Sequence, residues 1–234
     1  EGLEGEDRGV MQMMFRNNED KPKGPSSPQT SGVDETKQAH YTVDPSPGRE
    51  MQARVEQLGI SWEVLDSWDF DVFSIDARVQ TGIVGWILLQ NTTTFGDICL
   101  KPDVTARFLQ TLAQNYWSDN AFHNWTHAVD VNHTLWRMIL ISSAHAFFTG
   151  LNQFALLVAA VGHDVGHFGL NNPFLIETVH ELAVRYNDRS PLENMHCSKL
   201  FEIVSGTPGV NIFEPLSKAE FFEIRMICVE TILH

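Results

Sequence analysis

From residue 102 onward, apolar residues recur at intervals of three and four, which is the spacing of one face of an α-helix. The first such segment begins at Pro102 and is predicted to run to about Trp117, with apolar positions at Val104, Phe108, Leu109, Leu112 and Tyr116. We expect further helices over residues 124–148, 151–164, 173–186, 192–204 and 217–233. In the last of these, Ser217 and Glu220 have the spacing of a capping box. No alternating pattern typical of strands competes with these helices, so the sequence predicts an all-α fold.

Residues 1–50 lack this periodicity. They hold five of the ten prolines, six of the sixteen glycines and few large aliphatic side chains. Such a segment cannot bury enough apolar surface to offset the conformational entropy lost on folding. We therefore expect a low-complexity linker, disordered or extended, over residues 1–50, and one folded domain over residues 51–234.

Composition and charge exclude several classes of partner. A formal net charge of -14 and a pI of about 5.0 repel nucleic-acid backbones, so we expect no nucleic-acid partner. The cysteines Cys99, Cys197 and Cys228 form no C-x-x-C pair and fit a reducing cytoplasm. The apolar run Phe154–Val161 is too short to span a bilayer, and no signal-peptide pattern opens the chain. Because the first residue is Glu1, we expect a segment of a longer product, whose other parts could tether it to a membrane.

The clustering of histidines is the strongest anomaly in the sequence, since seven of the ten fall between positions 123 and 180. His123 and His127 are four residues apart and share one face of a helix. His163 and Asp164 are adjacent, and near a helix end both can reach one ion although their side chains point about 100° apart. Imidazole nitrogen and carboxylate oxygen together suit zinc, iron or manganese. Asp164 has two oxygens, so it could also bridge to a second ion.

The same residues also have a purely structural interpretation. A single histidine on an apolar helix more often forms a hydrogen bond in the core than it ligates a metal, and adjacent His-Asp pairs arise by chance. Periodicity alone therefore leaves metal binding and a structural role open. His133, His145 and His180 fit structural or surface positions, and His40, in the predicted linker, fits exposure to solvent.

Three motifs resemble those of one enzyme family, the class I cyclic-nucleotide phosphodiesterases. FHNWTHAVDV at 122–131 resembles Y-H-N-x-x-H-A-x-D-V, GHDVGHFGLNNPFL at 162–175 resembles H-D-x-x-H-x-G-x-x-N-x-F-L, and YNDRSPLENMH at 186–196 resembles Y-N-D-x-S-x-L-E-N-H-H. The motifs come in the family order, and LDSWDFDVFSI upstream resembles the opening that places an aromatic-rich helix against the core. The resemblance covers roughly residues 58–234 and implies a compact multi-helix HD-type fold.

The resemblance also implies a metal centre. His127, His163 and Asp164 are expected to ligate a tightly held ion, usually zinc in this family. Asp164 is expected to bridge to a second ion, usually magnesium or manganese, which water molecules otherwise hold. The two ions would activate water for attack on the phosphodiester.

Four other residues take roles around that centre by the same resemblance. His123 is the expected general acid, which protonates the leaving ribose 3′-oxygen. His167 and Glu193 are expected to orient metal-bound water from outside the metal shell, and Asn172 to lie near that water and the phosphate. The implied activity is hydrolysis of 3′,5′-cyclic AMP, cyclic GMP or both to 5′-nucleoside monophosphates.

The chain departs from the family pattern in three ways. Phe122 replaces a tyrosine, and Met195 replaces the first histidine of E-N-H-H. The family's last metal-ligating aspartate and its purine-binding glutamine have no counterpart before His234, so we expect a catalytic domain that is incomplete on its C-terminal side and inactive by itself. The helix at 217–233 is apolar around much of its circumference, and we expect missing catalytic helices or a partner to cover it. The sequence leaves open whether the protein forms a homodimer.

Two other functions compete with this interpretation. Another HD-type phosphohydrolase would share the His-Asp pair but not the HNWTH and LENMH surroundings. A catalytically silent nucleotide-binding or scaffold module would not need a proton donor at His123 beside His127. The sequence does not distinguish cyclic AMP from cyclic GMP as the substrate.

Overall fold

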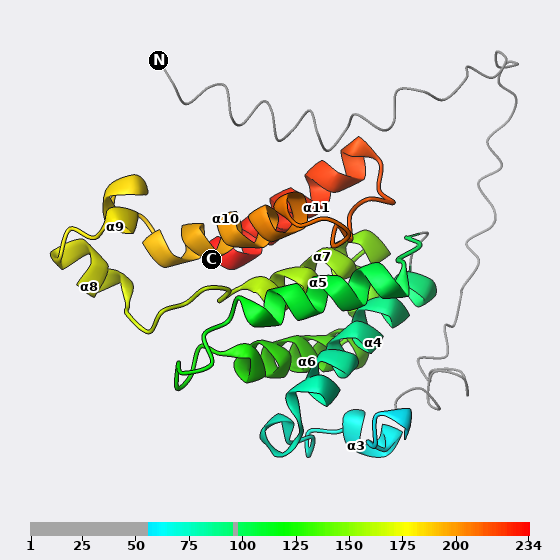
Figure 1. Ribbon diagram of the computed structural model, residues 1–234. Helices are drawn as coiled ribbons and strands as arrows, with labels where there is room; N and C mark the ends of the chain where they lie inside the picture. The colour runs from blue at the N-terminus through cyan, green and yellow to red at the C-terminus, as the bar shows by residue number, and fades with distance from the viewer. Residues whose placement is uncertain (1–55, 96–97) are drawn as a thin grey trace, which may run out of the picture. The chain divides into compact units, whose positions relative to one another are not determined.

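Residues 56–95 and 98–234 are described by a computed structural model, and they form helices joined by turns, with no strand among them (Figure 1). In chain order the elements are α3 Trp62–Leu65, the 3₁₀ turn η1 Val72–Ser74, α4 Ala77–Phe95, α5 Pro102–Gln114, α6 Trp125–Ile141, the 3₁₀ turn η2 Ala144–Ala146, α7 Gly150–Gly162, α8 Asn172–Glu177, α9 Glu181–Arg185, α10 Pro191–Gly206 and α11 Lys218–Leu233. The all-α prediction is confirmed. The predicted linker at residues 1–50 lies outside the described residues.

Helix α7 is the centre of the packing. Its sequence is apolar almost throughout, and ten of its thirteen residues are buried. A helix that is apolar on all sides needs cover on all sides, and α7 packs against α4, α6 and α11. At its N-terminus Thr149 and Asn152 form a reciprocal capping box, which satisfies two backbone N–H groups. Figure 1 shows α10 and α11 on one side of α7, and α4 and α6 on the other.

The aromatic stretch near residue 65 does not form the aromatic-rich helix that its resemblance to the family opening predicted. It forms the single turn α3 and, after a loop, the turn η1. The side chains of Ser61 and Asp71 accept hydrogen bonds from the backbone N–H groups of Val64 and Phe73. Each bond caps the N-terminus of one turn, so the segment forms two short capped turns.

Three tryptophans anchor that segment to the rest of the fold. The rings of Trp62, Trp86 and Trp136 make mutual edge-to-face contacts, with centroids 5.4 to 5.9 Å apart. His133 Nε2 lies 2.7 Å from the Leu65 carbonyl oxygen. The buried His133 therefore has the structural position that the sequence favoured.

Two predicted helices end early at residues with positive φ. The helix expected over 124–148 ends at Ile141, where the Ser142 hydroxyl donates to the Met138 carbonyl and Ser143 takes φ 55°. The helix expected over 173–186 divides into α8 and α9 at Val179, which has φ 53°. A β-branched residue with positive φ is a backbone outlier, and neither break has a glycine or proline to signal it.

Helix α11 confirms its predicted N-terminus. Glu220 N–H donates to Ser217 Oγ over 3.3 Å, and Ser217 N–H donates to Glu220 Oε2 over 2.7 Å. One face of the helix is buried and packs against α7 and α10; its buried residues are Phe221, Ile224, Cys228 and Ile232. Met226 on the opposite face is 54% exposed. The expected cover for that face stays a prediction.

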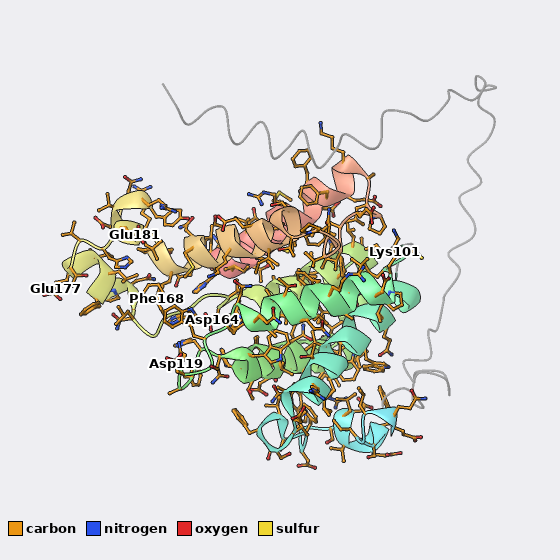
Figure 2. The ribbon with its side chains drawn as sticks, in the orientation of Figure 1. Lys101, Asp119, Asp164, Phe168, Glu177 and Glu181 are labelled. Atoms are coloured by element: carbon orange, nitrogen blue, oxygen red, sulfur yellow. The ribbon has the colours of Figure 1, made fainter. Side chains whose placement is uncertain are left out.

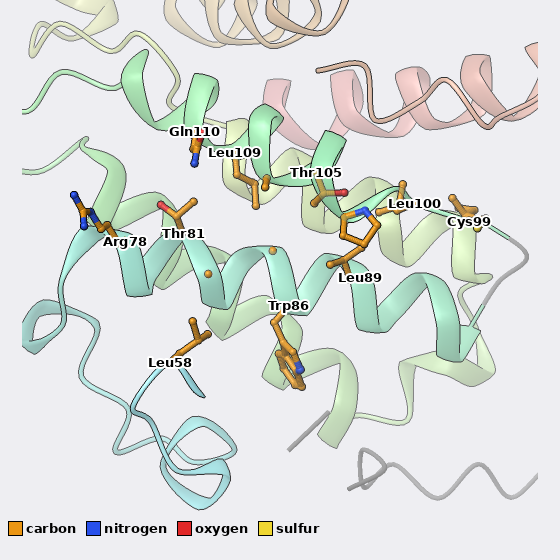
Figure 3. Close-up of a pocket in the computed structure, with 15 residues that line it drawn as sticks. Leu58, Arg78, Thr81, Trp86, Leu89, Cys99, Leu100, Thr105, Leu109 and Gln110 are labelled. Carbon is orange, nitrogen blue, oxygen red and sulfur yellow. The ribbon is translucent and has the colours of Figure 1, made fainter. Parts of the chain in front are cut away.

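An apolar cavity of about 500 Å³ lies between α4 and α5 (Figure 3). Its walls include Leu58, Trp86 and Leu109, and Arg78 and Gln110 lie at one end. None of the clustered histidines lines this cavity. Within the described ranges, no helix combines the length and the hydropathy that a membrane span requires.

The tryptophan cluster yields a stability prediction. Trp136→Ala leaves a cavity among Trp62, Trp86 and His133, and truncation of a buried tryptophan costs about 3–5 kcal/mol. Urea unfolding followed by circular dichroism should show this loss. Met138→Ala is the matched control, since Met138 lies on the same helix and is 52% exposed, and its change should stay within about 0.5 kcal/mol. Equal losses in the two variants would contradict the packing.

Candidate metal centre

Segments that are distant in the sequence meet at one end of the helices. Figure 2 shows Asp119, Asp164 and Phe168 at this end, whereas Lys101 lies at the opposite end of α5. Asp119 belongs to the loop before α6, and the other two follow α7. The first turns of α6 and the residues after α7 therefore present their side chains to a common volume.

His127, His163 and Asp164 form a compact group in this volume. Asp164 Oδ2 lies 3.1 Å from His163 Nε2 and 3.5 Å from His127 Nε2. One ligand atom from each residue lies within 4.8 Å of the other two, which is close enough for one metal ion to contact all three. The three residues predicted to share an ion are thus brought together.

Backbone carbonyls determine which nitrogen of each ring faces the carboxylate. His163 Nδ1 lies 2.8 Å from the Ala160 carbonyl oxygen, and His196 Nδ1 lies 2.9 Å from the Val165 carbonyl oxygen. A carbonyl only accepts, so each Nδ1 carries its hydrogen and the neutral ring presents the lone pair of Nε2. Lone pairs of His163 and of the Asp164 carboxylate therefore converge, and a proton or a cation must lie between them.

His196 is a site residue to which the sequence analysis assigned no role. Its Nε2 lies 3.7 Å from Asp164 Oδ1, so the two oxygens of Asp164 face different imidazoles. Asp164, His167 and His196 make a second group that could hold an ion. The spacing of Glu193 and His196, three residues apart on one helix face, was the signal in the sequence. The two oxygens of Asp164 therefore border two neighbouring groups, and bridging by Asp164 stays a prediction.

His167 has the opposite tautomer. Its Nδ1 accepts a hydrogen bond from Gly169 N–H over 3.0 Å, so a neutral His167 ring carries its hydrogen on Nε2. A protonated nitrogen donates hydrogen bonds and does not ligate a metal. His167 therefore fits the predicted role of orienting water better than that of a direct ligand.

His123 lies beside the group without joining it. Its ring stacks on His167, with centroids 3.9 Å apart and an interplanar angle of 9°, and its centroid lies 6.1 Å from that of His127. The Asn124 side chain caps α6 by accepting from His127 N–H over 3.2 Å. His123 precedes the N-cap Asn124, so it lies in the loop before α6 and not on the helix face that the spacing of four residues predicted, and from that loop its ring still lies next to His127.

Asn172 and Glu193 pair with one another. Asn172 Nδ2 lies 3.1 and 2.8 Å from the two carboxylate oxygens of Glu193, and Asn172 Oδ1 accepts from Leu192 N–H over 3.0 Å. These bonds tie the start of α8 to the first turn of α10. Met195, which departs from the family motif, packs against the apolar cluster around Leu175.

Tyr116 supports the group from the loop after α5, although the sequence marked it only as an apolar helix position. The buried hydroxyl donates to the Val161 carbonyl over 2.9 Å and accepts from Asp164 N–H over 3.4 Å. It thereby fixes the backbone at the end of α7, where the chain leaves the helix.

The pKa values follow from this geometry. Burial raises the pKa of Asp164. The hydrogen bond from His163 and the charges of His163, His196 and His123 have a larger opposite effect, and the pKa falls from 3.8 to about 2. Burial lowers the pKa of His163, but the interactions of His163 with Asp164 and with the Ala160 carbonyl outweigh burial. The pKa of His163 is therefore raised above 6.5. Burial, followed by the charge of His163, lowers the pKa of His127. Near pH 6.5, His163 therefore holds a proton more firmly than His127 does.

Comparison with known proteins identifies the segment that carries these residues. A family model described as 3′5′-cyclic nucleotide phosphodiesterase matches residues 122–234. Residues 122–234 are therefore similar to that family. The phosphodiesterase match contains all seven residues that the sequence predicted for the site.

Individual phosphodiesterases extend the similarity further along the chain. A 3′,5′-cyclic-AMP phosphodiesterase, isoform F, of Drosophila melanogaster is 31% identical over 218 residues, which is 91% of this chain and 33% of that protein. The 3′,5′-cyclic-AMP phosphodiesterase 4C of Rattus norvegicus is 34% identical over 182 residues, 76% of this chain and 34% of that protein. The chain thus spans about a third of the length of these relatives.

A solved phosphodiesterase structure shares the fold. The phosphodiesterase domain of the Salpingoeca rosetta rhodopsin phosphodiesterase superposes with a TM-score of 0.68 at 34% identity, over 76% of this chain and 53% of that one. The expected HD-type helical architecture is therefore confirmed.

The environment of Asp164 predicts a pH effect on the metal-free chain. Because the folded pKa of about 2 lies below the ordinary 3.8, Asp164 contributes about 2 kcal/mol of stability above pH 3.8, which is lost as the pH falls toward 2. Asp164→Asn removes this contribution. Urea unfolding in chelator should show the gap between wild type and variant shrinking by about 1 kcal/mol from pH 5 to pH 3. A gap that does not change over this range would contradict the depressed pKa.

Proposed function

We propose that the protein carrying this chain hydrolyses 3′,5′-cyclic nucleotides to 5′-nucleoside monophosphates at this centre. The observation that carries the proposal is the convergence of His127, His163 and Asp164, with His123 beside them, inside the segment matched to the family. The fruit-fly and rat relatives are named as cyclic-AMP phosphodiesterases, so cyclic AMP is the first substrate to test, followed by cyclic GMP.

His127, His163 and Asp164 fit a divalent cation by the chemistry of their donors. Two imidazole nitrogens and a carboxylate oxygen suit zinc, and the second oxygen of Asp164 suits magnesium or manganese. A cation held by these residues would lower the pKa of water bound to it and would neutralise charge on the phosphate. The backbone carbonyl bond to His163 keeps its Nε2 lone pair available for the cation.

His123 is proposed to supply the proton that the leaving ribose 3′-oxygen needs. An alkoxide is a poor leaving group, and a positioned imidazolium that protonates it contributes about 10²–10⁴-fold in rate. The stacked ring of His123 lies next to His127, so its proton is available close to the metal ligands. His167 and Glu193 are proposed to orient water, and the Asn172 amide holds the Glu193 carboxylate in place.

Two substitutions separate the acid from the ligand role. His123→Ala should lower kcat about 10²–10⁴-fold and leave metal content unchanged, because His123 lies outside the ligand group. Asp164→Ala should remove metal and activity together. Release of 5′-nucleotide by the full-length protein and elemental analysis measure the two effects, and Met138→Ala, at a side chain that is 52% exposed, is the control. Equal metal content in both inactive variants would show that Asp164 is not a ligand.

Zinc affinity should depend on pH through His163. A cation needs the Nε2 lone pair, which a proton occupies below the raised pKa of His163, so affinity falls by up to about tenfold per pH unit as the pH drops below that pKa. Competition with a chelating dye between pH 6 and pH 8 measures this slope. His123→Ala is the control and should keep the slope. Affinity independent of pH in this range would contradict the coupling of His163 to Asp164.

A further inference from the structure

Asn120, in the loop between α5 and α6, uses both ends of its side-chain amide. Its Oδ1 accepts from Phe122 N–H over 3.2 Å and from His123 N–H over 3.1 Å. Its Nδ2 donates to the His167 carbonyl oxygen over 3.1 Å and lies 3.4 Å from His167 Nδ1. One side chain therefore connects the segment that carries the proposed acid to the segment that carries the ring stacked on it.

These two segments are far apart in the sequence. His167 follows Asn120 by 47 residues, so no local helix geometry sets their distance. The Asn120 carbonyl oxygen also accepts from Asn124 Nδ2 over 3.0 Å, which ties the loop to the N-cap of α6. Asn120 is thus a junction between the start of α6 and the loop after α7.

Only an amide meets the requirements of this position. The two N–H groups of Phe122 and His123 need an acceptor, and the His167 carbonyl needs a donor. Aspartate offers the acceptor but no donor, and alanine offers neither. The bonds of Asn120 therefore hold the backbone that carries the His123 ring against the backbone of His167.

We infer that Asn120 is a positioning residue, which holds the His123 imidazole against His167 at the edge of the metal centre. The consequence for catalysis rests on the proposed function, because it requires His123 to be the acid. In the described part of the chain, none of the hydrogen bonds of Asn120 reaches His127, His163 or Asp164. Its loss should therefore displace the acid and spare the cation.

Nuclear magnetic resonance on the 234-residue chain tests the position directly. The wild type should show nuclear Overhauser contacts between the ring protons of His123 and His167. Asn120→Ala should lose them, and its zinc affinity should stay within about twofold. Asn115→Ala is the matched control, since Asn115 Nδ2 donates only to the Thr111 carbonyl on its own helix, and it should keep the ring contacts.

A second variant guards against unfolding of the first. Asn120→Asp keeps the acceptor for the Phe122 and His123 N–H groups and loses the donor to His167, so the ring contacts should weaken in a folded chain. Unchanged ring contacts in both variants would overturn the inference.

Leaving-group dependence tests the catalytic consequence. Asn120→Ala should lower kcat for the cyclic nucleotide by about tenfold to a hundredfold, with KM unchanged. Hydrolysis of bis(p-nitrophenyl) phosphate should change less than about threefold, because p-nitrophenolate leaves without a proton. Equal losses on both substrates would overturn the positioning role. These assays use the full-length protein that carries this chain. If its wild type hydrolyses neither substrate, the proposed function is contradicted, while the ring contacts still decide where Asn120 holds His123.

Discussion

The centre depends on one electrostatic constraint, which is that the neutral rings of His163 and His196 have no hydrogen on the nitrogen that faces the Asp164 carboxylate, so a proton or a cation has to lie between them. The carbonyls of Ala160 and Val165 bind the Nδ1 hydrogens of His163 and His196. Each neutral ring therefore turns a basic nitrogen toward a carboxylate oxygen. The nitrogen lone pairs and the carboxylate oxygens repel one another until a positive charge lies between them. A bound cation removes this repulsion.

The rest of the fold allows these groups to meet. Helix α7 is buried along its length and ends at Gly162, just before His163. A Cβ on Gly162 would lie only 2.9 Å from the nearest side-chain carbon of Leu200, so glycine lets α10 approach the end of α7. That approach carries His196 to Asp164. Tyr116, in the loop after α5, fixes the backbone of Asp164 on another side.

Much of this could be predicted from the sequence. Apolar spacing of three and four residues identified the helices, because burial of one face selects that period. The density of histidines around Asp164 indicated a candidate centre, and the resemblance of three motifs to one enzyme family assigned the individual roles. His196 and Asn120 were missed because their roles depend on contacts across 31 and 47 residues, which no local pattern encodes. The breaks at Ser143 and Val179 were missed because their positive φ is imposed by packing and not by glycine.

The central claim is that His127, His163 and Asp164 share one cation. X-ray absorption spectroscopy of the zinc-loaded chain tests it most directly. We predict nitrogen and oxygen ligands at about 2.0–2.2 Å, with outer-shell scattering from two imidazoles that falls to one in His127→Ala. A zinc spectrum without imidazole scattering, or one that His127→Ala leaves unchanged, would contradict the shared site.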